Sequence, residues 1–243
     1  MNVLRPVVLA LSIVMLCLAP GPAAAWEVSD RATAQDFEAF HDRFASSAYF
    51  WARHGAKPLG ITGFEIWVDT SVDSGFGDEG FARTALDGDL PGDVLAVTRV
   101  GVRKGLPGGF DLGAAYGRAL DGDVELVSGE LSWALLEGGA VSPAVGLRLT
   151  GTQTHSAEAY DLEQYGLEVL VSKGFPVVTP YGGAGLVWSE SRLERFGGDR
   201  LEEDSTETVL FAGVRLKLLL PSLTIEVEQG EETQAAVRLG FGF

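Results

Sequence analysis

From residue 59 onward, apolar and polar side chains alternate one by one along the chain. The run 208–219 shows the pattern, with an apolar face made of Leu210, Ala212, Val214, Leu216 and Leu218. Arg215 and Lys217 lie on its other face. The same division recurs in 94–103, 145–149, 165–171 and 223–227. A period of two predicts β-strands with one apolar and one polar side.

The alternating runs predict about ten strands. They begin near Leu59, Val94, Phe110, Val124, Ala144, Asp161, Val177, Glu207, Leu223 and Thr233. A soluble β-sandwich would alternate in the same way, but most runs are about nine to eleven residues long, which suits a tilted membrane strand. We therefore expect an all-β protein, a single antiparallel transmembrane β-barrel of about ten strands, within a range of about 8–12.

The connections between these runs alternate in length. Tight, glycine- or proline-rich turns occur at 104–108, 137–139, 173–176 and 220–222, and long polar segments occur at 71–93, 154–160 and 189–206. Outer-membrane barrels have short periplasmic turns and longer external loops. We expect the tight turns and both ends of the barrel sheet on the periplasmic side.

A different period precedes the strands. In 36–53, Phe37, Phe40, Phe44, Ala48 and Trp51 recur at steps of three and four, which predicts an amphipathic helix. We expect it to pack on the barrel or against the membrane face, with a disordered arm as the alternative. His41 and His54 flank the apolar stripe without a third ligand nearby, so solvated histidines are expected and no metal site.

The amino terminus has the layout of a secretory signal peptide. Arg5 supplies positive charge, 6–19 is apolar, and Ala23, Ala24 and Ala25 form a cleavage site. An uncleaved anchor is the alternative, disfavoured by the short apolar core. The expected organisation is a signal peptide at 1–25, a helical segment at 26–58 and an outer-membrane barrel at 59–243. Cys17 is the chain's one cysteine, so the mature protein would have no disulfide.

Charge excludes two classes of partner. The chain has 34 Asp and Glu against 18 Lys and Arg, a formal net charge of −16. It has no basic stripe to neutralise phosphates, so we expect no nucleic-acid partner. The same balance disfavours a peripheral protein held to anionic lipid.

The polar faces of the strands carry the candidate functional residues. The side chains predicted to point into the lumen are Glu65, Arg99, Arg103, Glu130, Arg148, Glu168, Arg215, Lys217, Glu226 and Arg238, together with Glu228. In a barrel of about ten strands such long side chains could meet, pair and fill the interior. We expect a closed barrel with a structural or surface-binding role. The alternative is a narrow, porin-like diffusion channel whose lumen charges set selectivity.

The last strand ends on alternating aromatic residues. Phe241 and Phe243 share a face with Val237 and Leu239, and the sequence stops at Phe243. This resembles the terminal strand of outer-membrane barrels, whose final aromatic residue the barrel-assembly machinery reads. The resemblance implies that Phe241 and Phe243 are an assembly signal.

Several turns and strand glycines are similar to those of an uncharacterised family of exported bacterial outer-membrane β-barrel proteins. The similar stretches are 56–65, 104–107, 134–140, 172–175 and 179–183. The resemblance implies a fold and a location, and it implies no activity or catalytic residues.

Enzymatic and metal-binding alternatives have less support. His155 and Ser156 lie in an external connection, but adjacent residues of an extended segment point to opposite sides, which disfavours a lipid-modifying enzyme. The acidic clusters at 87–93 and 121–125 could bind Ca²⁺ or bridge lipopolysaccharide, although turn formation explains them better. We expect no enzyme and no cofactor; the expected partners are outer-membrane lipid, lipopolysaccharide and the barrel-assembly machinery.

Replacing the final aromatic residue tests the assembly signal. For Phe243→Ala we expect less folded, heat-modifiable protein and an accumulation of periplasmic precursor, because the terminal strand would be read poorly. Quantitative blots of membrane and periplasmic fractions measure both. An unchanged outer-membrane yield at normal expression would leave Phe243 without this role.

Overall fold

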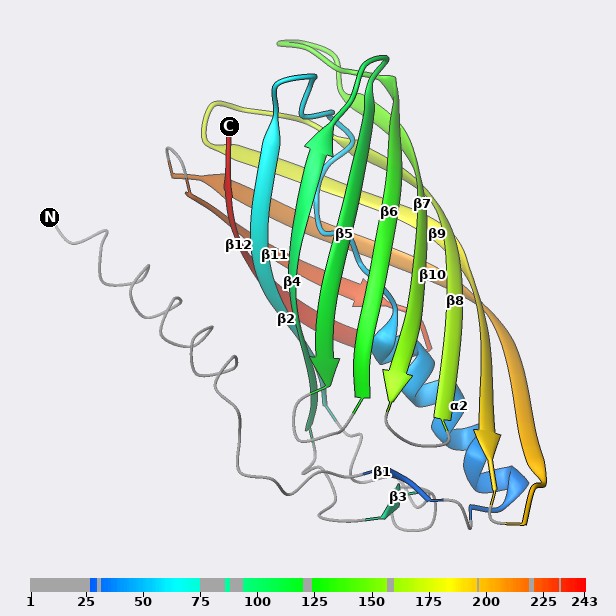
Figure 1. Cartoon of the computed structure of the whole chain (residues 1–243). Helices are drawn as coiled ribbons and strands as arrows, with labels where there is room; N and C mark the ends of the chain where they lie inside the picture. Colours follow the sequence, from blue (N-terminus) through cyan, green and yellow to red (C-terminus); the bar gives the residue numbers. More distant parts are fainter. Residues whose placement is uncertain are drawn as a thin grey trace, which may run out of the picture.

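The computed structural model describes residues 27–29, 32–74, 86–87, 94–119, 124–156, 160–195, 197–218, 221–231 and 233–243. Ten antiparallel strands form a closed ring in which each strand pairs with its neighbours along the chain, and the last strand pairs with the first (Figure 1). The ring consists of β2 (Phe64–Ser74), β4 (Val94–Gly105), β5 (Phe110–Ala119), β6 (Val124–Leu136), β7 (Ala144–Ser156), β8 (Tyr160–Ser172), β9 (Val178–Glu194), β10 (Arg200–Lys217), β11 (Pro221–Gln229) and β12 (Thr233–Gly242). The prediction of a ten-stranded antiparallel barrel is confirmed.

Two strand boundaries differ from the sequence-based expectation. The first strand begins at Phe64 and not at Leu59, because residues 49–63 lead into it from inside the barrel. In the segment 189–206, expected to be a loop, β9 and β10 continue into a long hairpin, near whose end the backbone N–H of Arg195 donates to the carbonyl of Asp199. Its polar composition hid the strands, because the outward residues form cross-strand ion pairs such as Arg200 with Glu194 at 3.2 Å.

The helix α2 (Ala34–Ala48) begins with a capping box. The Thr33 hydroxyl accepts a hydrogen bond from the Asp36 backbone N–H, and the Asp36 carboxylate accepts one from the Thr33 N–H. The helix ends at Ala48, five residues before the predicted end at Arg53. At Tyr49 the backbone leaves the helical conformation, and the chain continues without regular secondary structure as far as β2.

The position expected for this helix was wrong. It lies inside the ring, and neither on the outer wall nor against a membrane face (Figure 1). The rings of Phe37, Phe40 and Phe44 have no solvent exposure. The apolar stripe therefore predicts burial correctly, but a helix period cannot say which surface covers the stripe.

An apolar core forms where α2 meets the inner face of the strands. At this end of the barrel the inward residues are aliphatic or aromatic, and they include Leu95, Val97, Leu126, Tyr160, Leu162 and Leu193. The ring of Tyr160 lies edge-on to Phe40 and Phe44, with centroid distances of 5.3 and 5.8 Å. Each aromatic contact of this kind adds to the burial of apolar area.

The outer face of the ring is apolar over its middle part. Exposed aliphatic side chains occur on every strand of the ring, and they include Val72, Val100, Leu112, Val127, Leu149, Leu167, Leu186, Leu210, Ile225 and Val237. Aromatic residues flank this belt, with Tyr116, Tyr165 and Trp188 nearer one end and the stacked pair Phe110 and Trp133 nearer the other.

The two ends of the barrel differ in structure. The turn end contains the connections 106–109, 137–143 and 173–177 together with Phe243. The opposite, hairpin end contains the start of α2 and a small two-stranded sheet of β1 (Glu27–Val28) and β3 (Leu86–Asp87) (Figure 1). In the described part of the chain, no helix combines the length and apolarity needed to cross a bilayer. The predicted signal peptide at 1–25 lies outside the described residues.

Truncating the helix stripe should weaken the whole fold. We expect Phe44→Ala to lower the free energy of unfolding by about 3–5 kcal/mol, since it leaves a cavity in a fully buried aromatic cluster. Denaturant unfolding in detergent micelles measures the change. Phe175→Ala is the control, because Phe175 is 55% exposed in a turn and should change stability little. Equal losses in the two variants would contradict a buried helix.

Candidate functional site

The interior of the barrel is occupied by one continuous segment, 34–58, which we call the plug. It consists of α2, which fills the lumen toward the hairpin end, and the irregular residues 49–58, which cross the rest of the lumen toward the turn end (Figure 1). Tyr49, Trp51, Arg53 and His54 are all at most 2% exposed. The plug is therefore in contact with the lumen wall along its length.

Arg53 is the centre of the first ionic cluster. Its guanidinium donates Nε to Glu228 Oε1 at 2.8 Å and Nη2 to Glu228 Oε2 at 3.1 Å, and it lies 3.2 Å from Asp69. Asp69 also accepts a hydrogen bond from Arg238 Nε at 2.9 Å. Arg53 has a φ of 45°, a left-handed conformation that costs a non-glycine residue energy, so these buried contacts must hold it.

A second cluster joins the plug to β6, β7 and β8. Arg148 donates to Glu168 at 2.7 Å, and the Tyr49 hydroxyl donates to the other oxygen of Glu168, also at 2.7 Å. His54 Nε2 lies 2.9 Å from Glu130 Oε2. Every carboxylate in this cluster therefore has a partner, as buried charges require.

Near the hairpin end, Arg43 fixes the helix itself. It forms a bidentate pair with Asp73 at 3.0 and 3.1 Å, and the Ser47 hydroxyl donates to the same carboxylate at 3.0 Å. Bidentate guanidinium–carboxylate pairs fix orientation as well as position.

Arginines of the wall also bind the plug backbone. Arg99 donates to the carbonyls of Ala48 and Tyr49 at 2.7 and 3.1 Å, and Arg148 donates to the carbonyl of His54 at 2.7 Å. Arg238 donates to the carbonyl of Ala52. These carbonyls have no strand or helix partner, so the wall supplies the hydrogen bonds that a buried, irregular segment needs.

Side chains of the wall also donate hydrogen bonds to the carboxyl end of α2. The last carbonyls of a helix have no partner within it and carry partial negative charge. Gln164 donates to the Ala45 carbonyl at 2.8 Å and Gln234 to the Ser46 carbonyl at 2.9 Å. Arg99 adds a positive charge there, whereas the helix has no basic residue in its own last turn.

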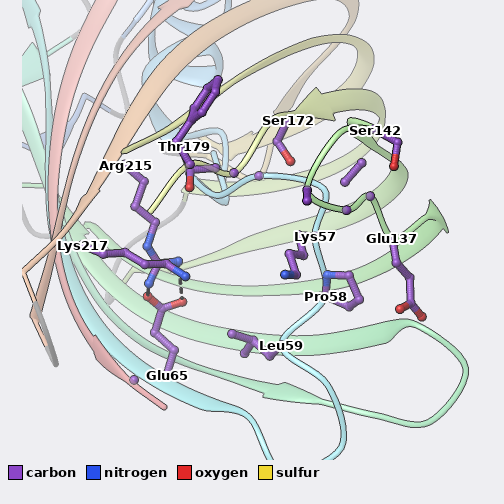
Figure 2. A pocket seen from close by; sticks show the side chains of 18 of the residues that line it. Lys57, Pro58, Leu59, Glu65, Glu137, Ser142, Ser172, Thr179, Arg215 and Lys217 are labelled. Atoms are coloured by element: carbon purple, nitrogen blue, oxygen red, sulfur yellow. Dashed lines mark hydrogen bonds and ion pairs between the residues drawn. The ribbon is translucent and has the colours of Figure 1, made fainter. Parts of the chain in front are cut away.

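A cavity opens beyond the plug at the turn end. Glu65 accepts a hydrogen bond from Arg103 at 2.9 Å and also binds Arg215 (Figure 2). Arg103 lies 3.8 Å from Asp111, whose carboxylate accepts the backbone N–H of Leu59 at 3.0 Å. Lys217 projects into the cavity and is exposed.

The hairpin end is acidic. Asp42, Glu207 and Glu231 line a second cavity there, of about 260 Å³. Partial burial and the neighbouring carboxylates of Glu38 and Asp42 raise the pKa of Glu203. Among the described residues, no three His, Cys, Asp or Glu side chains are grouped so that they could hold a metal ion. The acidic clusters at 87–93 and 121–125 lie mostly outside those residues.

The structure places the predicted lumen charges as follows. Glu65, Arg99, Arg103, Glu130, Arg148, Glu168, Glu226 and Arg238 are buried inside the ring, Arg215 is partly buried, and Lys217 is exposed in the cavity. Phe241 and Phe243 are exposed at the turn end. His155 and Ser156 end β7, and their side chains lie outside the described part of the structure.

Sequence reasoning missed five charged residues of the site. Asp69, Asp73 and Asp111 are buried wall residues, and Arg43 and Arg53 belong to the plug. The first two could have been found, because they share the parity of Glu65 along β2. Arg43 and Arg53 could not have been found, because no sequence pattern in a helical or irregular segment predicts that the segment lies inside a barrel.

The expectation for the histidines was wrong. His41 and His54 are buried, and His41 bridges the hydroxyls of Ser191 and Ser205 at 2.6 and 2.9 Å. Both were expected in solvent because the segment was placed outside the barrel.

Comparisons with known proteins found solved outer-membrane structures of low similarity. No protein-family model matches the chain, and no curated protein matches it. Among solved structures, the N-terminal β-barrel domain of Pseudomonas aeruginosa OprF has 15% identity and a TM-score of 0.37, covering 76% of this chain and 99% of that domain. The KdgM porin has 10% identity and a TM-score of 0.39, with 74% and 99% covered. Neisserial surface protein A has 12% identity and a TM-score of 0.29, with 74% and 94% covered. At these values the likeness carries no information on activity or ligand.

Breaking one buried pair should be costly. We expect Arg148→Ala to lower the free energy of unfolding by about 3–5 kcal/mol, because Glu168 loses its cationic partner and the carbonyl of His54 loses a hydrogen bond. Arg192→Ala is the matched control at an exposed pair with Glu190, where the loss should be about 0–1 kcal/mol. Chemical unfolding of both variants in the same detergent provides the comparison. A loss for Arg148→Ala as small as that of the control would mean that the lumen charges are solvated.

Proposed function

We propose that the protein is an integral outer-membrane β-barrel that is closed by its own plug and has a structural or surface-binding role. The apolar belt around the ring, flanked by aromatic residues, supports a membrane position, because such a surface is stable in lipid and aggregates in water. Lipid and lipopolysaccharide would contact this belt, and the barrel-assembly machinery would insert the chain. We propose no catalytic activity.

One observation supports a closed barrel most directly. Arginines on three different strands of the wall, Arg99, Arg148 and Arg238, donate hydrogen bonds to backbone carbonyls of the plug. Removing the plug would leave these guanidinium groups with fewer partners in a narrow lumen. The wall and the plug are therefore complementary in charge and in hydrogen bonding, which a freely open channel would not need.

Conductance in planar bilayers tests the closed state. We expect the wild-type protein to show no steady single-channel conductance, since the plug fills the lumen. Weakening the plug with Arg53→Ala and His54→Ala together should produce intermittent openings, because Glu228, Asp69 and Glu130 lose partners. Arg192→Ala, on the exposed hairpin, should stay silent.

The opposite result would favour a porin-like function. A steady wild-type conductance whose ion selectivity changes in Arg148→Ala, with little loss of stability, would make the protein a narrow diffusion channel. The lumen charges would then line water and set selectivity.

Epitope tags test the orientation. We expect a tag at Gly197, in the turn of the long hairpin, to be accessible to antibody on intact cells. A tag at Gly108, in a tight turn, should be detected only after the outer membrane is permeabilised, because short turns face the periplasm. Labelling of the Gly108 tag on sealed cells would reverse the topology.

A further inference from the structure

The cavity at the turn end has the size of a small-molecule site. Its volume is about 540 Å³, within the range of roughly 300–1,000 Å³ that is usual for ligand pockets. The plug residues Gly55, Lys57 and Pro58, with the following Leu59, form part of its lining, and strand ends together with the turns 137–143 and 173–177 form the rest (Figure 2). The plug therefore closes the cavity on one side while the turn end leaves it accessible.

Positive charge dominates the lining. Lys57, Arg103, Arg215 and Lys217 face the cavity, whereas the acidic side chains there are Glu65 and Glu137. Glu65 is already engaged by both Arg103 and Arg215. This is unexpected in a chain with a net charge of −16, two of whose four lysines line this one cavity.

The lysines are not neutralised by the protein. No hydrogen bond or ion pair from the described residues reaches the ammonium group of Lys57 or Lys217. The charges around Lys217 are mostly positive, since Arg215, Lys57 and Arg103 lie near it and Glu65 is the acidic neighbour. Arg103 is 2% exposed, and its Nε and Nη1 lack a hydrogen-bond partner within the described structure. These two nitrogens are buried, so they add positive charge beside the cavity but make no contact with a ligand in it.

The remaining wall has an apolar component. Pro58, Leu59, Ala140 and Phe175 line the cavity beside the cations. Ligand sites of this kind combine a few charged groups that fix orientation with apolar walls that hold the body of the ligand.

We propose that this cavity binds a small organic phosphate. The phosphate group would lie among Lys57, Arg215 and Lys217, and its organic part would contact Leu59 and Phe175. The ligand could be a soluble phosphate ester or the headgroup of a phospholipid, which share this chemistry. The proposal goes beyond closure of the barrel, and its test does not depend on conductance.

Calorimetric titration of the folded, full-length protein in a nonionic detergent tests the site. The probes are inorganic phosphate, phenyl phosphate and a short-chain phosphatidylglycerol. We expect saturable binding of one phenyl phosphate per chain, tighter than that of inorganic phosphate and weaker at higher salt. Tighter binding of the phosphatidylglycerol would assign the site to a headgroup, and weaker binding would assign it to a soluble ester; either result supports the site.

Matched variants locate the binding. Lys217→Gln should weaken phenyl phosphate binding about fivefold, the value of one partly exposed ion pair, and adding Lys57→Gln should weaken it further. Phe175→Ala should remove the preference for phenyl phosphate over inorganic phosphate. Arg192→Gln, an exposed cation on the distant hairpin, should leave both affinities unchanged.

Two results would overturn the proposal. One is the absence of saturable binding for all three probes in protein that is shown to be folded by its heat-modifiable migration. The other is an unchanged dissociation constant in the double lysine variant, which would place any binding elsewhere. Since both lysines are exposed and lack protein partners, these variants should fold like the wild type.

Discussion

The structure depends on one constraint: every polar group that is buried inside a narrow barrel needs a partner. The lumen contains both acids and arginines, and neither set can stay ionised there without compensation. The strands alone do not provide it, because Glu228 pairs with the plug residue Arg53, and Glu130 has its hydrogen-bonding partner in the plug residue His54. The plug in turn has carbonyls without partners, and arginines of the wall satisfy them. Wall and plug therefore stabilise each other.

The same constraint divides the lumen into zones. Where the plug is helical, its backbone is internally bonded, so the wall can be apolar and pack against phenylalanines. Where the plug has no regular secondary structure, from Tyr49 to Pro58, its backbone needs outside partners, and the wall changes to arginine and glutamate. The change in wall chemistry follows the change in plug conformation. Past the plug, cations without protein partners line the cavity at the turn end.

The two ends of the barrel differ in charge, because the end with the long hairpin of β9 and β10 is acidic and the turn end is cationic. Exposed ion pairs cover the hairpin, and carboxylates from α2, β10 and the β11–β12 turn surround the second cavity. The turn end has short connections between its strands and contains the cationic cavity. A barrel with such a polarity can meet different partners on its two sides, and its field would favour anions only at the turn end.

The sequence by itself determined the barrel, a strand number of about ten, the starts of most strands and the inward parity of the charged residues. It did so because a period of two is a local property of a strand with one face in an apolar medium. It also determined that Phe37, Phe40 and Phe44 share a buried face. Only the tertiary structure decided that this face lies inside the ring, that 189–206 is a hairpin, and that His54, Arg43 and Arg53 complete the lumen. These features arise from contacts between residues far apart in the chain, such as Arg53 and Glu228, and no local pattern encodes which distant surface will satisfy a buried group.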